Sequence, residues 1–417
     1  MGLSRRRQDA EAIFREAIGL RPAAAPGRAD RGPELAEQGK YAEAEVALRE
    51  AIRDTPDSPC LHHNLGVVLE RQSKYAEAEA AFREAIRLAP GDVSAYLGLA
   101  FTLRRRGKWS EEATTYARAI RVTPGDADLH AELGHALSAQ ARFAESEAAF
   151  RTALRLAPEN PELHLELGIA LGRQGKHAEA EAHLVGAIRL DPQNTVARRN
   201  LALGVGRQGR YPESEALYRE TIRLDPNNAR LHRELGVTLY FQGDLAGAEA
   251  AFREAIRVSP GYVRAHSDLG ELLSEQGRHA EAAAAFHEAI RLKPDSYSAH
   301  RALGGAFFSQ GHYARAEMAY RDAIRLNPDD SKSHFYLWDV LEKQGKYVEA
   351  EAAYREAIRV KPDHAEAHAR LGRALFRQGR FAEAETAYRE AIRLSPDDAK
   401  YRSALQMVMQ RLPNAAD

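Results

Sequence analysis

Apolar and small residues recur along the chain with a period of 34 residues. Proline marks this period, and when each repeat is numbered so that the proline is position 32, position 7 is leucine in eleven of twelve repeats. Position 8 is glycine or alanine in ten repeats, position 24 is aromatic in ten, position 27 is alanine in eleven, and position 28 is always isoleucine or leucine. A fixed period of this length is typical of a solenoid. The prolines are Pro22, Pro56, Pro90, Pro124, Pro158, Pro192, Pro226, Pro260, Pro294, Pro328, Pro362 and Pro396.

Each repeat is predicted to form two helices. Positions 4, 7, 8 and 11 make one stripe at helical spacing, and positions 20, 24, 27 and 28 make a second. Glycine at position 15 suits the end of the first helix, and proline at position 32 ends the second. Nine of eleven junctions carry an N-cap residue at position 34, before the next helix. These residues are Ser58, Asp92, Asp126, Asn160, Asn194, Asn228, Ser296, Asp330 and Asp398.

These columns, with Leu-Gly at positions 7 and 8 and an aromatic residue four after the alanine of position 20, resemble the tetratricopeptide repeat. Segments such as 63–66 and 75–79 most resemble bacterial arrays and the repeat arm of O-GlcNAc transferase. The resemblance covers nearly the whole chain. It implies an all-α fold, a right-handed α-solenoid superhelix of helix-turn-helix repeats. Trp338 departs from the pattern at position 8, so repeat 331–364 is expected to be a local bend or a weak joint.

The period predicts the division of the chain. Residues 1–24 are a half-repeat holding only a second helix, over residues 8–21, and residues 25–58 are a degenerate repeat whose first helix is interrupted by Pro33. Ten tandem repeats fill residues 59–398, and residues 399–417 are a capping helix and tail. The two end helices carry apolar stripes that either act as caps or dock head to tail, which would give weak self-association into rings or filaments. The stripes are Ala10, Ile13, Phe14, Ala17 and Ile18 at one end, and Leu405, Val408, Met409 and Leu412 at the other.

Composition excludes several classes of protein. The 59 basic and 60 acidic residues nearly cancel, which argues against a nucleic-acid partner. No apolar run of about 18 residues is present, so no membrane span is expected. The single cysteine, Cys60, rules out a disulfide framework and fits a reducing compartment, so a cytoplasmic location is expected.

No motif predicts catalysis, a cofactor or a metal. The glycines Gly204, Gly206 and Gly209 match G-x-G-x-x-G, but a dinucleotide site needs them after a strand, whereas here they fall at the predicted end of a helix. Cys60 and the adjacent His62 and His63 have no further predicted ligand. We therefore expect that the chain is not an enzyme.

Histidine occupies position 4 in eight repeats, where the packing stripe runs. One interpretation is a pH-sensitive column, because partly buried imidazoles titrate near neutrality. The favoured interpretation is a flat, half-polar filler that replaces the aromatic residue of the family. These residues are His62, His130, His164, His232, His266, His300, His334 and His368.

In the resembled family the first helices line a concave groove that holds the ligand. Positions along this face gather aromatic and basic residues in repeats 229–398, a composition typical of interaction hot spots. The alternative is that the aromatic residues only pack against neighbouring repeats. The predicted peptide-binding residues are Arg233, Tyr240, Phe241, Arg264, Arg301, Phe308, Phe335, Tyr336, Arg373 and Phe376.

Two known binding devices of the family are disfavoured. No three consecutive repeats supply the residues of the carboxylate clamp. Asparagine at position 6, which in the O-GlcNAc transferase arm grips peptide backbone, remains only at Asn64 and Asn200.

The resulting hypothesis is a non-catalytic scaffold that binds a peptide or an extended segment of another protein in its groove. Two alternatives stay open. The chain is a regulatory or substrate-recruiting arm of a separately encoded enzyme, such as a glycosyltransferase, or it is a self-assembling structural element.

Overall fold

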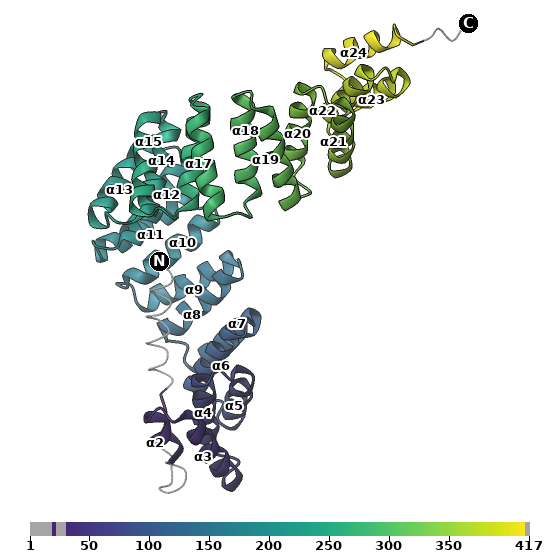
Figure 1. Ribbon diagram of the computed structural model, residues 1–417. Coiled ribbons are helices and arrows are strands. Elements are labelled where there is room, and N and C mark those ends of the chain that lie inside the picture. The colour runs from purple at the N-terminus through teal and green to yellow at the C-terminus, as the bar shows by residue number, and fades with distance from the viewer. Residues whose placement is uncertain (1–18, 22–30, 413–417) are drawn as a thin grey trace. The chain divides into compact units, whose positions relative to one another are not determined.

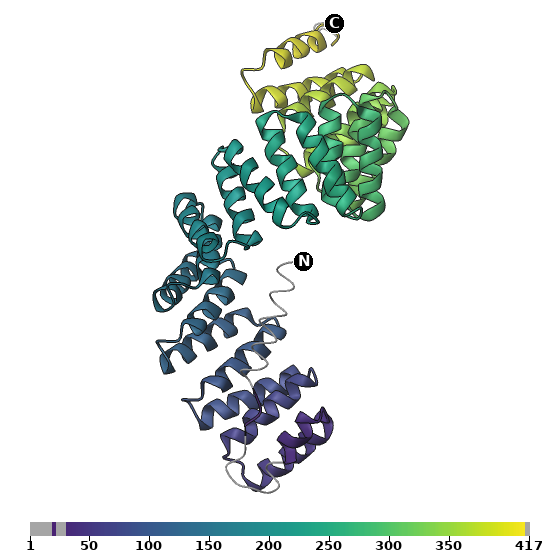
Figure 2. The same cartoon turned by 90° about the vertical axis from the view of Figure 1, so that its left-hand side faces the viewer.

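The computed structural model describes residues 19–21 and 31–412. All regular secondary structure in this part of the chain is helical, in helices α2 to α24 (Figure 1). The chain divides into two compact units, Met1–Asp225 and Pro226–Asp417. Within each unit every described helix packs against its sequence neighbours (Figures 1 and 2). The predicted all-α solenoid is therefore confirmed.

The helices of the first unit pack in successive pairs. They are α2 (Arg31–Glu37), α3 (Tyr41–Asp54), α4 (Pro59–Arg71), α5 (Tyr75–Leu88), α6 (Val93–Arg105), α7 (Trp109–Val122), α8 (Ala127–Ala139), α9 (Phe143–Leu156), α10 (Pro161–Arg173), α11 (His177–Leu190), α12 (Thr195–Arg207) and α13 (Tyr211–Leu224). Pro33 lies within α2, and Gly32, Pro33 and Ala36 of this helix are buried.

The second unit follows the same scheme. Its helices are α14 (Ala229–Gln242), α15 (Leu245–Val258), α16 (Val263–Glu275), α17 (His279–Leu292), α18 (Tyr297–Ser309), α19 (Tyr313–Leu326), α20 (Ser331–Lys343), α21 (Tyr347–Val360), α22 (Ala365–Arg377), α23 (Phe381–Leu394) and α24 (Ala399–Met409). In α24, Tyr401 and Val408 are buried, whereas Met409 of the predicted apolar stripe is exposed. The predicted helix over residues 8–21 falls almost wholly outside the described residues.

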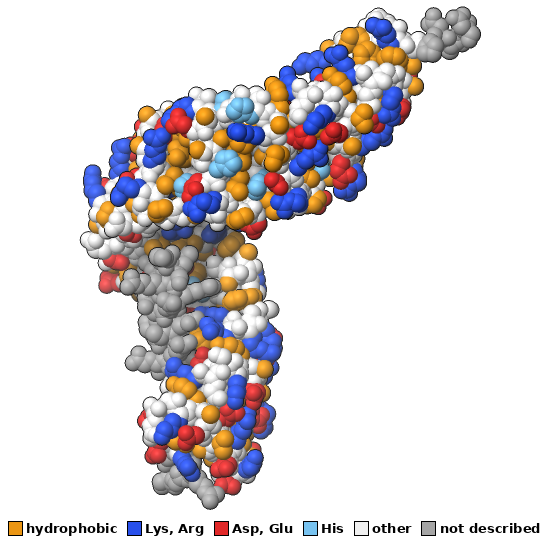
Figure 3. Space-filling model, in the orientation of Figure 1, with side chains coloured by type: hydrophobic (Ala, Val, Ile, Leu, Met, Phe, Trp, Pro, Cys, Tyr) orange, Lys and Arg blue, Asp and Glu red, His pale blue; other side chains and the backbone are white. Residues whose placement is uncertain are grey.

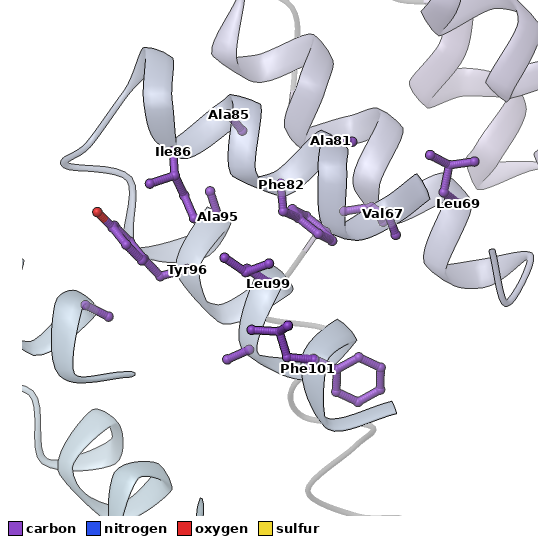
Figure 4. Packing of buried hydrophobic residues seen from close by; sticks show 14 of the residues in the cluster. Val67, Leu69, Ala81, Phe82, Ala85, Ile86, Ala95, Tyr96, Leu99 and Phe101 are labelled. Carbon is purple, nitrogen blue, oxygen red and sulfur yellow. The ribbon is translucent and has the colours of Figure 1, made fainter. Parts of the chain in front are cut away.

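The core is built around the ring at position 24. Phe82 lies between the glycines of two successive first helices, and a Cβ added at Gly66 would stand 2.8 Å from its ring, or at Gly98 2.4 Å. Figure 4 shows Phe82 among the buried side chains of this part of the core. A side chain at either glycine would collide with the ring, so glycine here sets the distance between helices.

The first helix of each repeat ends in a left-handed residue at position 15. Nine repeats supply glycine there, and the other two repeats place Ser73 and Ala141 at φ 59° and 58°. A side chain in this conformation costs about 1–2 kcal/mol, because its Cβ approaches the following carbonyl oxygen.

We therefore expect Ala141→Gly to stabilise the protein by about 0.5–1 kcal/mol, the strain relieved less the backbone entropy that glycine loses. The matched control Gly175→Ala should destabilise it, because Gly175 has φ 78°. Urea unfolding followed by circular dichroism measures both. Equal stability of Ala141→Gly and the wild type would contradict the assignment of strain.

Side-chain caps occur at seven of the nine predicted N-cap positions: Asp92, Asp126, Asn160, Asn194, Asn228, Ser296 and Asp398. Ser58 makes no such bond, and neither does Asp330, whose carboxylate accepts hydrogen bonds from Arg301 and Ser333 instead. His364, which the pattern did not suggest, caps α22 through Nδ1.

The position-4 histidines share one contact. In all eight, Nε2 lies 2.8–3.2 Å from the carbonyl oxygen of the proline six residues earlier. At the same position Arg198 and Arg402 also donate to a proline carbonyl. Histidine therefore recurs because it packs as a ring and donates an N–H to the turn. This is a more specific reason than space filling, and pH sensing stays a prediction.

A glutamate at position 21 of the repeat, in its second helix, binds side chains of the next repeat. Glu147 accepts hydrogen bonds from Gln174 at 2.8 Å and Lys176 at 2.7 Å, both of the following repeat, and from Arg151 of its own helix at 2.9 Å. Glu45, Glu317 and Glu351 are bound in the same way. Burial alone would raise the pKa of Glu147, but these bonds outweigh it and lower the pKa to about 2.

The sign of the pH dependence follows from this lowered pKa. The contribution of Glu147 is complete above its ordinary value of 4.5 and is lost as the pH falls from there toward 2. At pH 7, Glu147→Gln should destabilise the junction by about 1.5–3 kcal/mol, since it removes hydrogen bonds to a charged group. The loss of stability relative to the wild type should become smaller as the pH falls from 4.5 to 2.

Urea unfolding across this pH range measures the effect. The matched control is Glu145→Gln in the same helix, whose carboxylate is 59% exposed and pairs only with Arg142 at 2.6 Å. It should change stability little, because exposed ion pairs contribute little. If the loss of stability in Glu147→Gln did not depend on pH, the stabilising role of the charged Glu147 carboxylate would be refuted.

Candidate functional site

The ten predicted binding residues all lie on first helices of the second unit. They fall on α14, α16, α18, α20 and α22. Figure 3 shows hydrophobic, basic and acidic side chains interspersed over the visible surface of this unit. The contacts of the individual residues separate those with a packing role from those that remain available to a ligand.

Two of the aromatic residues at position 12, Phe308 and Phe376, pack locally. The ring centroids of Phe308 and Tyr313 are 5.6 Å apart, and those of Phe376 and Phe381 are 5.4 Å apart. Each pair spans the turn of a single repeat. These contacts favour the packing alternative for Phe308 and Phe376.

Tyr240 and Phe241 form a separate pair at the end of α14. Their rings meet edge to face with centroids 5.5 Å apart, and the Tyr240 hydroxyl donates to the Glu275 carboxylate at 2.8 Å. Phe241 is 60% exposed. This pair offers apolar surface to solvent.

Most of the predicted arginines are held by carboxylates. Arg233 donates to Asp268 of the following repeat at 2.5 Å, and Arg301 binds Asp330, the last residue of its own repeat, at 2.8 Å. Arg373 pairs with Glu342 of the preceding repeat, whereas Arg264 is exposed. The face therefore carries ion pairs between repeats, which the sequence pattern, read one column at a time, did not reveal.

An aromatic cluster on α20 is the strongest feature of this face. We define the α20 cluster as Phe335, Tyr336 and Trp338 together with Tyr320 and Tyr354. The Trp338 ring lies 4.3 Å from both Phe335 and Tyr354, and Tyr336 stacks on Tyr320 at 5.7 Å. Tyr336 is 41% exposed, whereas Trp338 is completely buried. Buried rings thus support an exposed one.

Arg370 completes the cluster. Its guanidinium lies 5.5 Å from the centroid of the Phe335 ring, and it pairs with Asp339 and Glu366. Burial raises the pKa of Asp339 and outweighs the effect of Arg370. Of the ten predicted residues, Phe335 and Tyr336 are the two joined in this cluster.

Edge-to-face and tilted contacts with Phe335 and Tyr354 accommodate the Trp338 ring, but its burial costs stability. Its indole Nε1 is buried without a hydrogen-bond partner. An unpaired buried donor costs about 1–3 kcal/mol.

We therefore expect α20 and α21 to open more easily than α18 and α19. Hydrogen exchange with mass spectrometry on the full chain measures the protection of each repeat. Protection of repeat 331–364 equal to that of repeat 297–330 would show that the junction is not weak.

Sequence reasoning missed a second set of contacts, in the first unit. Gly19–Arg21 is not helical, although the pattern placed it at the end of a helix. Instead, Asn64 hydrogen-bonds the backbone of Arg21, and the Arg21 side chain pairs with Asp92. Asparagine at position 6 was the signal available in the sequence.

The remaining motifs have structural roles. Gly204 and Gly206 lie within the last turns of α12, and Gly209 takes a positive φ after it. Arg104 pairs with Glu112, and Arg106 pairs with Glu79. Among the described residues, no group of three or more His, Cys, Asp or Glu could hold a metal ion. None of the described helices is long and apolar enough to cross a membrane.

A tetratricopeptide repeat model matches residues 29–93, 63–127, 132–195 and 199–263, which together are more than half of the chain. The chain belongs to the tetratricopeptide repeat family. A model described as the C-terminal domain of cilia and flagella-associated protein 70 also matches, over residues 242–417. Tetratricopeptide repeats are generally interaction modules. No curated protein matches the chain.

Similar solved structures are themselves repeat proteins. Yeast Tom70 is 16% identical, with 92% of this chain and 94% of that chain covered and a TM-score of 0.41. MamA is 26% identical over 40% of this chain and 98% of its own, with a TM-score of 0.38. YrrB, described as having an unusual peptide-binding site, is 23% identical over 45% and 96%, with a TM-score of 0.39. The family assignment rests on the repeat model, since all three TM-scores are below 0.5.

Proposed function

We propose that the second unit binds a peptide or an extended segment of a partner protein along its first helices, without catalysis, and that the α20 cluster is the anchor. The observation that carries this proposal is the partly exposed Tyr336 ring, stacked on Tyr320 and adjacent to Phe335. A groove lined by first helices is what the family resemblance implies for this face.

The α20 cluster has the physical properties of an interaction hot spot. Rigid aromatic rings supply a large contact area at a low cost in conformational entropy. Trp338 and Tyr354 hold Phe335 in place before any ligand arrives. The rigid rings therefore favour an apolar or aromatic side chain of the ligand at this point.

The ion pairs around the cluster favour a particular kind of ligand. Because Arg301 and Arg373 already have carboxylate partners, a ligand gains little from a single charge and must compete with an existing pair. We infer that apolar contact supplies most of the affinity and that the paired charges orient the ligand.

Two further functions remain proposals. A regulatory or substrate-recruiting arm of a separate enzyme would use the same face. Head-to-tail assembly would use the end helix α24, on which Met407 and Met409 are more than half exposed. The near-neutral charge and the single cysteine support a cytoplasmic location and a partner other than nucleic acid.

We expect Tyr336→Ala to reduce recovery of the main partner in an affinity pull-down by about tenfold or more, the loss typical of a hot-spot side chain. The combined variant Tyr240→Ala, Phe308→Ala and Tyr336→Ala should remove the partner. Mass spectrometry with isotope labels quantifies the recovery. The matched control is Met318→Ala on α19, a second helix, where the side chain is 68% exposed.

Full recovery with the combined variant, when circular dichroism shows it folded, would rule out this face. Light scattering over a hundredfold concentration range separates assembly from ligand binding. A mass fixed at 46.2 kDa throughout would exclude head-to-tail association.

A further inference from the structure

In the first unit, side chains of α4 hydrogen-bond the backbone of Gly19–Arg21. The side-chain amide of Asn64 makes two hydrogen bonds to Arg21: its Oδ1 accepts from the backbone N–H and its Nδ2 donates to the carbonyl oxygen, both at 2.9 Å. This pair of bonds recognises the main chain of an extended segment whatever its side chain. It is the grip that a strand offers to one residue of its neighbour in an antiparallel pair.

Neighbouring side chains of α4 add to this grip. His63 Nε2 lies 3.4 Å from the carbonyl oxygen of Gly19, and Cys60 Sγ lies 3.7 Å from that of Arg21. Burial, assisted by the charge of Arg21, lowers the pKa of His63 to about 4. The ring is therefore neutral at physiological pH and does not repel a guanidinium nearby.

A carboxylate at the start of α6 selects the side chain. Asp92 binds the Arg21 guanidinium through two parallel bonds of 2.7 and 2.6 Å, a geometry that lysine cannot reproduce. The Asp92 side chain is 6% exposed and also caps α6 by accepting from the Ala95 N–H. The carboxylate is thus fixed in place by the helix that it caps.

Among the residues that the structure describes, this combination occurs once. Asn200 is the other asparagine at position 6, but its amide donates to Val196 of its own helix at 2.8 Å, and its repeat ends in Asn228 instead of an aspartate. A backbone grip beside a buried carboxylate is therefore particular to α4 and α6. Leu20 packs against the core between the two gripped carbonyls.

We propose that Cys60, His63, Asn64 and Asp92 form a second binding site, for an extended peptide that carries an arginine, and that Gly19–Arg21 occupies this site in cis. A partner peptide of this kind competes with the chain's own segment. Its apparent affinity is reduced by the fraction of molecules in which the site is open. The site lies in the first unit and is independent of the α20 cluster.

The test uses the full chain and a fluorescein-labelled peptide with the sequence of residues 17–23. Arg21→Ala removes the guanidinium of the competing segment and leaves Asn64 and Asp92 intact. Fluorescence anisotropy should show at least tenfold tighter binding of the peptide to this variant than to the wild type. The same peptide with alanine in place of its arginine should lose this binding.

A matched pair of variants tests the carboxylate in the Arg21→Ala background. Asp92→Asn keeps an N-cap residue on α6 but removes the charge, and it should abolish peptide binding. Asp126→Asn makes the same change at the cap of α8, where the carboxylate accepts only from backbone N–H groups, and it should leave binding unchanged. Circular dichroism checks that each variant is folded.

Arg21→Lys is a milder second variant for use if Arg21→Ala unfolds. It keeps the charge but not the two parallel bonds, and it should bind the peptide more tightly than the wild type does. Equal affinity of the folded variant and the wild type would overturn the proposal, as would absence of binding. Equal losses from Asp92→Asn and Asp126→Asn would also overturn it, because capping alone would then explain the effect.

Discussion

The close approach of glycine to an aromatic ring is the constraint on which the rest of the structure depends. A ring such as Phe82 fills the space that glycines on two successive first helices leave open. Every repeat that keeps this pair sets the same distance between helices, so the turns and caps recur at the same positions. Where Trp338 replaces the glycine, the Phe335 and Tyr354 rings pack against it at steep angles, and its indole N–H is left without a partner.

Polar groups then fix each repeat to the next. Glutamates such as Glu147 are buried and are bound by side chains at the turn of the following repeat, while the position-4 histidines donate to the proline carbonyls. Because these bonds join only neighbours, stability is distributed along the array. A local defect such as Trp338 therefore has local consequences.

The same neighbour contacts shape the surfaces proposed for binding. In the second unit they neutralise arginines that would otherwise face a ligand, and they leave the α20 cluster as the exposed apolar feature with rigid support. In the first unit the buried Asp92 is held by its role as a cap, and the chain's own Arg21 satisfies it. The two proposed sites thus differ in chemistry, one aromatic and one selective for arginine.

The sequence by itself determined the period, the helix boundaries and the family, because each depends on residues within one repeat. Only the tertiary structure decided which arginines of the face are paired, because the ion pairs of Arg233 and Arg301 join residues about one repeat apart. It also distinguished Phe308, which packs against Tyr313 across the turn of its own repeat, from Tyr336, which stacks on the buried Tyr320 and stays partly exposed. The contact between Arg21 and Asp92 spans 71 residues, and no periodic pattern within the repeats encodes such a distance.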